Sequence, residues 1–255
     1  MRDGGLKIGL GSSAAGAAAA AGLVYAAHGR NPEDPQARTE ILNAALAGHR
    51  AVSPKGSGAD VAASVRGGFL RFRRLGDTVE SYVLDWPSAL EIRVVWTGQE
   101  ARTSNFLAKV EGLATSSPGR YRSVLAALGS EADAFVSAAL AKDVPGIIES
   151  TAAYGEAMRE LGVAAGIEIV TDTLSEVADL ARKAGGAAKP SGAGGGDVAL
   201  CLFPDSASAE RFERFCSASG LRILSIKLGV PGVKLEPSDG TTTESPSAFG
   251  GSEAA

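Results

Sequence analysis

Three glycine-rich segments of this chain carry the residue types that bind phosphate groups. They read "GLGSSAA" (Gly9–Ala15), "GSGAD" (Gly56–Asp60) and "KPSGAGGGD" (Lys189–Asp197). Glycine lets a backbone approach a ligand closely, while serine hydroxyls and free amide groups donate hydrogen bonds to anions. The three segments lie far apart in the chain. A shared site therefore requires a fold that brings them together.

The first segment predicts an anion site at the start of a helix. Ala14–Ala27 has high helix propensity, and Ser12 and Ser13 are favourable N-cap residues. Unpaired amides at a helix N-terminus, together with about half a positive charge from the helix dipole, attract phosphate. The two hydroxyls can also reach a phosphate oxygen or Mg²⁺. Because the segment matches neither the Walker nor the dinucleotide pattern, a capped alanine helix packed on a sheet remains an alternative.

The third segment places four glycines among five consecutive positions, 192–196, just before a predicted strand. A plain turn needs only one or two glycines, so the excess favours a backbone that wraps closely round a ligand. A flexible linker is the alternative. In the middle segment, Asp60 follows a Gly-Ser-Gly turn at the start of an apolar helix. Asp60 is either an N-cap or a carboxylate that orients an attacking oxygen or accepts its proton.

The elements that must hold these segments are predicted from periodicity. Helices are expected over 14–27, 34–52, 104–115, 121–142, 145–161 and 171–183, and over 206–219. Strands are expected over 67–75, 80–86, 90–98, 198–203 and 222–229. This order predicts an α+β fold with helices on one face of an antiparallel sheet. The predicted domains are 1–86 and 87–233, followed by a disordered tail over 234–255 that is rich in proline, glycine and serine.

Composition excludes several classes of protein. The 255 residues carry a net charge of −4, and no long basic run offers a surface for nucleic acid. The two cysteines and two histidines lack the spacing of a zinc site, and the cysteines are expected to be free thiols. A signal peptide or membrane span over 7–27 is disfavoured, because alanine and glycine contribute little to membrane insertion. A cytoplasmic protein without a membrane or nucleic-acid partner is the expectation.

The three segments, in this order, resemble the later motifs of the GHMP kinases, and within them the phosphomevalonate kinase family. "GSGADVAASVRGG", "DWPSALEIRVVWTGQEARTSNFLAKV" and "KPSGAGGGDVAL" carry the finer match. The resemblance covers about residues 9–228. It implies the GHMP kinase fold, with a ribosomal S5 domain 2-like N-terminal part and a ferredoxin-like α/β C-terminal domain. In that family a Pro-Gly-Lys-like segment and adenine-contacting strands precede the first loop. We therefore expect a truncated N-terminal domain over 1–86.

The resemblance implies transfer of the γ-phosphoryl group of ATP, with Mg²⁺, to 5-phosphomevalonate, a small-molecule substrate. Asp60 and Ser13 match the catalytic positions, with Ser13 near the metal ion. The positions that match the ATP and phosphate loops are Gly9, Gly11, Ser12, Ser13, Ala14, Gly192, Ala193, Gly194 and Gly195. Ser191 matches the same loop over the transferred phosphoryl group, and Ser57 and Asp197 match further substrate contacts. Weaker matches to substrate-phosphate contacts are Thr97, Ser104, Asn105 and Lys189. Another small-molecule kinase of the superfamily, such as mevalonate kinase, and a truncated non-catalytic paralogue remain alternatives.

Overall fold

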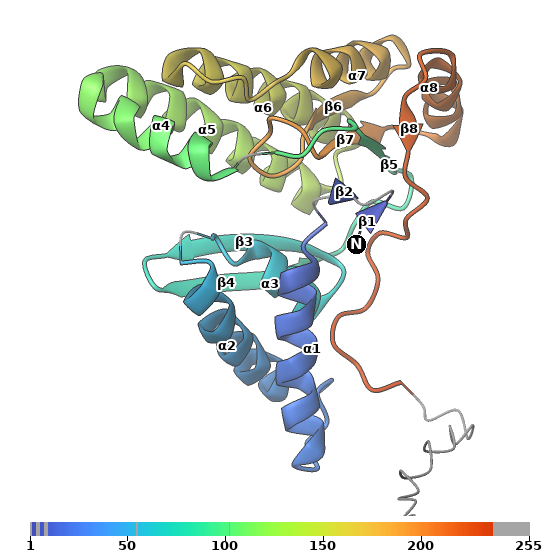
Figure 1. Ribbon diagram of the computed structural model, residues 1–255. Helices are drawn as coiled ribbons and strands as arrows, with labels where there is room; N and C mark the ends of the chain where they lie inside the picture. The colour runs from blue at the N-terminus through green and yellow to red at the C-terminus, as the bar shows by residue number, and fades with distance from the viewer. Residues whose placement is uncertain (1, 4–5, 8–9, 55, 102, 237–255) are drawn as a thin grey trace, which may run out of the picture.

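The computed structural model describes residues 2–3, 6–7, 10–54, 56–101 and 103–236. Its elements form two groups, one above the other in Figure 1. The lower group consists of α1 (Ser12–Ala27), α2 (Pro35–Val52), α3 (Ala59–Arg66), β3 (Phe69–Leu75) and β4 (Thr78–Leu84). The short strands β1 (Arg2–Asp3) and β2 (Leu6–Lys7) pair between the groups. The predicted tail beyond residue 236 lies outside the described residues.

The upper group combines five helices with a four-stranded antiparallel sheet in the order β6-β7-β5-β8. Its elements are β5 (Glu91–Trp96), α4 (Thr103–Ser116), α5 (Pro118–Ala141), α6 (Val144–Ala165), α7 (Asp172–Lys183), β6 (Ala187–Pro190), β7 (Val198–Phe203), α8 (Ser206–Ala218) and β8 (Arg222–Ile223). The predicted helices and the strands of β5 and β7 are confirmed. Two predictions differ: β6 forms where a loop was expected, and the last strand is shorter than expected.

Small side chains hold the lower group together. Along α1, Ala14, Ala18 and Gly22 are buried: Ala14 and Ala18 belong to one cluster with apolar residues of α2 and α3, and Gly22 lies against Val233. Alanine lets two helix backbones approach closely, because it projects only a methyl group. The apolar residues that complete this cluster are Ile41, Leu42, Ala45, Leu46, Val61, Ala62 and Val65. One stripe of the alanine run is therefore a packing surface against α2 and α3.

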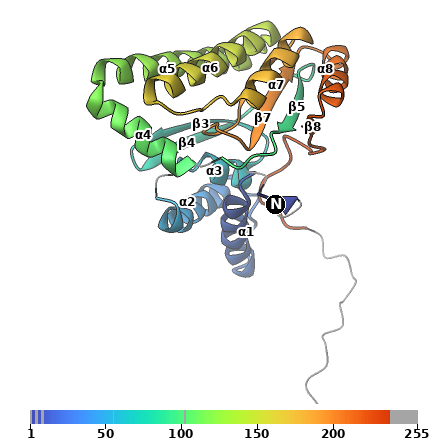
Figure 2. The same ribbon diagram turned by 45° about the horizontal axis from the view of Figure 1, so that its top comes forward.

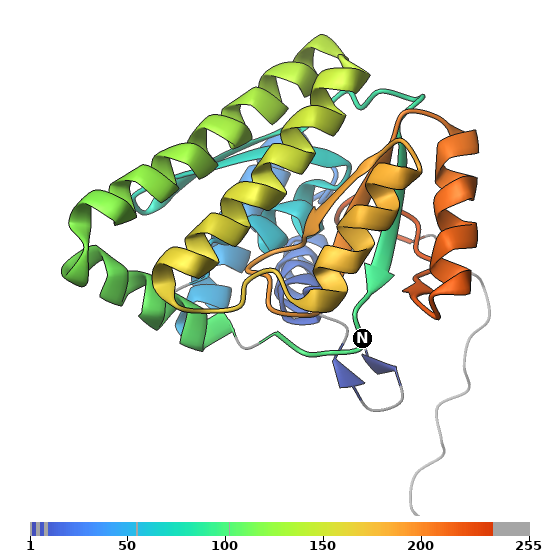
Figure 3. The same cartoon turned by 90° about the horizontal axis from the view of Figure 1, so that it is seen from above.

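The upper sheet is covered mainly on one face, by α7 and α8 (Figures 2 and 3). Val95, Cys201 and Phe203 on the sheet pack against Val177 of α7 and Phe212 of α8, and all five are fully buried. On the opposite face, the junction of α5 and α6 contacts one end of the sheet. The prediction that the helices lie on one face of the sheet thus holds for α7 and α8, whereas α5 and α6 reach the other face.

Both cysteines are free thiols in the core under α7 and α8, as expected. Burial raises the pKa of Cys201 well above its usual value and raises the pKa of Cys216 to about 11. Both thiols therefore stay protonated at neutral pH.

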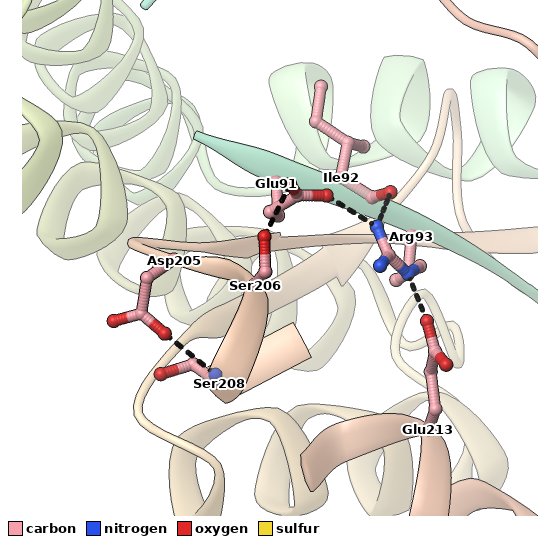
Figure 4. Close-up of polar contacts among 7 residues, drawn as sticks. All are labelled: Glu91, Ile92, Arg93, Asp205, Ser206, Ser208 and Glu213. Atoms are coloured by element: carbon pink, nitrogen blue, oxygen red, sulfur yellow. Dashed lines mark hydrogen bonds and ion pairs between the residues drawn. The ribbon is translucent and has the colours of Figure 1, made fainter. Parts of the chain in front are cut away.

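A charged network fastens β5 to α8 at the exposed edge of this core (Figure 4). Arg93 pairs with Glu213 of α8 through Nε and with Glu91 through an N–O contact of 2.9 Å. The Ser206 hydroxyl donates to Glu91 at 3.0 Å, and Asp205 caps α8 by accepting from the Ser208 amide. The Arg93 guanidinium and the Ser206 hydroxyl hold the pKa of the Glu91 carboxyl below its usual value. The network belongs to the scaffold and lies away from the glycine-rich segments.

The described chain returns to the lower group after β8, which brings its C-terminal residues into contact with that group. Gly67 forms a β-bridge with Pro231, and Val233 packs in the cluster of α1, α2 and α3. Phe69 of β3 stacks on Trp86 with ring centroids 4.4 Å apart, and Trp86 lies beside Phe135 of α5. The last residues of the predicted second domain therefore pack on the first group of elements.

Among the described helices, α5 is the one whose length and apolar composition would allow a membrane span. Length and composition alone are weak evidence, because apolar helices of many folds share them. In this structure α5 lies alongside α6 (Figure 3). The helix over the alanine run, α1, is shorter than a span requires.

We predict that Gly232→Ala destabilises the protein. A Cβ at this position would lie 2.2 Å from the carbonyl oxygen of Val65 and 2.6 Å from the amide nitrogen of Gly67, and neither backbone atom can move aside cheaply. The expected loss in the free energy of unfolding is about 1–3 kcal/mol, measured by denaturant titration. The matched control is Gly129→Ala on α5, where no atom lies within 4 Å, and a gain of up to about 1 kcal/mol is expected. Equal stability of the two variants would contradict the tight C-terminal contact.

Candidate active site

The first turn of α1 presents amide groups without a capping side chain. Gly11 is the N-cap residue, in the left-handed region at φ 70°, and the first helical bond runs from the Ala15 amide to its carbonyl. The amides of Ser12, Ser13 and Ala14 precede that bond and have no acceptor within the helix. The two serines were predicted as N-caps, but they lie inside the first turn, and the glycine takes the cap because it tolerates the positive φ.

A side chain closes α6, α7 and α8 at the same point, whereas α2, α3 and α5 have no side-chain cap. Asp143, Thr171 and Asp205 each accept a hydrogen bond from an amide in the first turn of α6, α7 and α8, respectively. In α1, no described side chain takes that role, and its first turn holds no acidic residue. The start of α1 therefore has the unpaired donors and the positive dipole end that an anion requires.

Asp60 lies directly beside this turn. It is in the first turn of α3, whose N-cap is Gly58, so the N-cap reading of Asp60 is wrong. The Asp60 Cβ is 3.5 Å, and its Oδ2 4.0 Å, from the point that a Cβ on Gly11 would occupy. The exposed carboxylate accepts the Val61 amide through Oδ1 at 3.0 Å, while the Ser57 hydroxyl oxygen accepts the Ala59 amide at 3.2 Å. The structure thus brings the first two predicted segments together.

His49 is a neighbour of this site that sequence reasoning missed. It lies on the buried face of α2 with 7% of its surface exposed, and its Nε2 is 3.3 Å from the Ser13 hydroxyl oxygen. The sequence shows His49 in helical register with Leu42, Ala45 and Leu46, which are core residues. A histidine in an apolar register is a weak signal of function, and only the packing of α2 on α1 shows what it touches.

The glycines of the third segment, between β6 and β7, serve mainly close packing. A Cβ on Gly194 would lie 2.4 Å from the Ile169 carbonyl oxygen, and one on Gly195 would lie 2.2 Å from the Phe106 ring. A Cβ on Gly196 would lie 2.8 Å from the Gln99 carbonyl oxygen. From the sequence, we attributed the excess of glycine to a ligand. In the structure, three of the four glycines are required because other segments of the same chain leave no room for a Cβ. Only Gly192 has open space around it, with φ 65°.

Asp197 holds this loop to the segment after β5. Its amide donates to the Gln99 carbonyl at 2.7 Å, and its carbonyl accepts both the amide and the hydroxyl of Thr97 at 3.0 Å. Its Oδ1 accepts the Ala101 amide at 3.2 Å, and its φ of 52° is unusual for a residue other than glycine. Asp197 and Thr97 were expected to contact substrate. In the structure their polar groups are used to join two loops.

Lys189 precedes the same loop on strand β6 and projects toward α6. Its ammonium group lies 5.2 Å from the centre of the Tyr154 ring and donates to the Pro190 carbonyl at 3.0 Å. Within the described residues it has no carboxylate partner. Burial lowers the pKa of Lys189 to about 8. A largely buried cation without a counter-charge is suited to an anionic ligand.

The remaining predicted residues are placed as follows. Ser191 is exposed, with its amide bonded to the Val198 carbonyl, and Ala193 is half-buried in the loop. Ser104 and Asn105 belong to α4, but their side chains lie outside the described part of the structure, as does Gly9. The β6–β7 loop lies on the side of the upper group that faces the start of α1 (Figures 1 and 3). The first and third segments therefore border one region between the two groups.

The described residues hold no cluster of three or more histidine, cysteine, aspartate or glutamate side chains that could bind a metal by themselves. A Mg²⁺ ion would need oxygen ligands from a bound phosphate, to which Ser13 and Asp60 could add a hydroxyl and a carboxylate. Mg²⁺ in proteins is commonly held in this way, by one or two protein oxygens together with substrate phosphates and water. The residues present fit such an ion.

Comparison with known proteins agrees with this geometry. Residues 5–68 match the GHMP kinases N terminal domain, and residues 147–220 match the GHMP kinases C terminal domain. A phosphomevalonate kinase from Streptomyces sp. (strain CL190) is 28% identical over 82% of this chain. The chain spans 61% of the length of that relative.

Solved structures show the same fold. A protein from Listeria innocua superposes with a TM-score of 0.82 at 24% identity, covering 90% of this chain and 69% of its own. Streptococcus pneumoniae phosphomevalonate kinase, in complex with phosphomevalonate and AMPPNP, gives a TM-score of 0.75 at 18% identity, with 88% and 70% covered. L. major mevalonate kinase, in complex with R-mevalonate, gives a TM-score of 0.62 at 21% identity, covering 71% of this chain and 54% of its own. The predicted fold class is confirmed.

We predict that Lys189 makes the free energy of unfolding of the protein vary with pH in the alkaline range. Its folded pKa of about 8 lies below the ordinary value of 10.5, so the unfolded chain binds more protons between these values. The contribution of Lys189 to the free energy of unfolding must then rise as the pH increases from about 8 to 10.5. The measurement is the free energy of unfolding of the wild type minus that of Lys189→Met across this range. A difference that stays constant with pH would show that Lys189 is not buried as a cation.

Proposed function

Because the chain belongs to the GHMP kinase superfamily, we propose that it transfers the γ-phosphoryl group of ATP to the phosphate of 5-phosphomevalonate. The bond between the γ-phosphorus and its bridging oxygen breaks, ADP leaves, and a bond forms to an oxygen of the acceptor phosphate, giving 5-diphosphomevalonate. The observation that carries this proposal is the uncapped first turn of α1 with Asp60 beside it. The Streptomyces relative supports phosphomevalonate as the acceptor.

The start of α1 binds the phosphates of ATP in this proposal. The amides of Ser12, Ser13 and Ala14 donate to phosphate oxygens, and Gly11 allows the backbone to turn there, with Gly9 before it. A bound Mg²⁺ would supply charge neutralisation for the phosphates, and the Ser13 hydroxyl, with Asp60 nearby, would help to hold it. Phosphoryl transfer depends mainly on positioning and electrostatic stabilisation, which amide-rich loops provide.

Asp60 orients the acceptor. The acceptor is already a phosphate, so its attacking oxygen needs no strong base, and the carboxylate acts by placing charge and by directing the oxygen. Lys189 and Ser191 bind an acceptor phosphate from the opposite side, where Lys189 offers a cation without a counter-charge. Gly192 leaves the loop open on the ligand side. Ser57, Ser104 and Asn105 complete the proposed acceptor contacts, and Ala193, Gly194 and Gly195 shape the loop.

In this proposal the protein is a cytoplasmic enzyme with small-molecule substrates. The division at residues 86 and 87 is part of this proposal, with the nucleotide on the side of α1 and the acceptor between the two groups. Mevalonate kinase activity and a non-catalytic, nucleotide-binding paralogue are the competing outcomes of the test below.

The test is ADP release by the 255-residue chain with Mg-ATP and phosphomevalonate, mevalonate or no acceptor. Release that depends on phosphomevalonate is expected for the wild type. Asp60→Ala is expected to abolish it while Mg-ATP affinity stays within about tenfold, because the amides that bind the nucleotide lie on α1.

Release with mevalonate alone would assign the competing activity, and Mg-ATP binding without release would indicate the non-catalytic protein. Equal loss of turnover and nucleotide affinity in Asp60→Ala would make this residue structural.

The β6–β7 loop is tested with a matched pair of glycine variants. Gly192 and Gly220 have φ of 65° and 71°, and neither has an atom within 4 Å of an added Cβ. An alanine substitution should therefore destabilise the protein equally at both positions, by about 1–2 kcal/mol of backbone strain. We expect Gly192→Ala alone to lower kcat/KM, by about tenfold or more, because a small displacement of a positioning loop is costly. Similar activity of the two variants would remove this loop from the proposed site.

A further inference from the structure

His49 differs from the other buried polar side chains of the described structure. Ser150 and Thr151 donate to carbonyl groups one turn earlier in their own helix, at 2.7 Å. Thr171 caps α7, and Ser208 accepts from Arg211 on the same helix. Each of these four is satisfied within its own element. The His49 ring instead contacts Ser13 on a different helix, 36 residues away in the chain.

Placing an imidazole at this position has a physical cost. His49 continues the apolar register of α2, next to Ala45 and Leu46, which pack on α1. A polar ring in such a cluster loses its hydration and regains only what its hydrogen bonds return. An aliphatic side chain of similar volume would pack there without that cost. The position is therefore better explained by what the ring nitrogen does than by the packing of α2.

What the nitrogen touches is the hydroxyl at the candidate active site. Ser13 is exposed in the first turn of α1, the turn that also faces Asp60. A serine hydroxyl has three staggered rotamers and a freely rotating proton. The hydrogen bond to Nε2 selects one rotamer, whichever tautomer the ring adopts. It leaves the remaining hydrogen-bonding capacity of the oxygen available to a ligand.

We propose that His49 is a positioning residue that holds the Ser13 hydroxyl toward the phosphates of bound Mg-ATP. This inference rests on the proposed nucleotide site. His49 itself stays beneath α1 and acts only through Ser13. The loss of the ring nitrogen must then have the same consequence for the ligand as the loss of the serine hydroxyl.

A double-mutant cycle on the 255-residue chain tests this. The variants are Ser13→Ala, His49→Phe, the two combined, and His49→Gln, whose amide nitrogen can replace Nε2. The affinity for Mg-ATP is measured by calorimetry, with the melting temperature as a record of folding. Thr151→Val is the matched control, because it also removes a buried polar group, one that is bonded only within its own helix.

Ser13→Ala and His49→Phe are each expected to weaken Mg-ATP binding by about tenfold, the size of a hydrogen bond to a charged group. The combined variant should bind no more weakly than Ser13→Ala alone, and His49→Gln should stay within about threefold of the wild type. Thr151→Val should lower the melting temperature without changing the affinity.

Effects of Ser13→Ala and His49→Phe that multiply in the combined variant would overturn the proposal, as would a His49→Phe variant that melts earlier but binds as tightly as the wild type. Unchanged affinity in Ser13→Ala would also overturn it while leaving the nucleotide site intact. A wild-type chain that does not bind Mg-ATP would instead overturn the proposed function, before any variant is compared.

Discussion

The close packing of α1 on α3 is the contact on which the candidate site depends. Ala14 and Ala18 are buried in one cluster with Val61, Ala62 and Val65 of α3. Because the helices approach so closely, the first turn of α1 lies beside the first turn of α3. An amide-rich helix start and a carboxylate are thereby placed next to each other.

The β6–β7 loop shows how a motif can have two physical explanations at once. Three of its glycines are required because other segments of the chain pass within contact distance, and Asp197 bonds the loop to the segment after β5. This rigidity does not argue against a ligand site. A loop that is fixed by its own packing holds Ser191 and Gly192 in place, which is what positioning a phosphate requires.

The two groups of elements are joined at several points of contact. Gly67 bridges to Pro231, and Val233 packs in the cluster of α1, α2 and α3. Trp86, which stacks on Phe69, lies beside Phe135 of α5. The region between the α1 start and the β6–β7 loop is therefore framed by both groups (Figure 1). A nucleotide on one side and an acceptor on the other would meet there.

The sequence by itself determined most of the elements and the three glycine-rich segments. Helix propensity and hydrophobic period depend on near neighbours, so α1, α5, α7 and the β3–β4 hairpin could be predicted without knowledge of the fold. The family resemblance supplied the roles of Asp60 and Ser13, and of the loop that contains Gly192. What local rules missed was β6, a strand of four residues whose pairing partner follows only after the glycine loop.

Only the tertiary structure decided which residues meet. It placed Asp60 beside Gly11 and brought the ring of His49 within hydrogen-bond distance of the Ser13 hydroxyl. It also assigned Asp197 to a loop junction, although its place in the motif had suggested a ligand contact. Each of these depends on the distance between segments that are far apart in the chain. Residue type and spacing along a chain carry no information on that distance until helices and strands have packed.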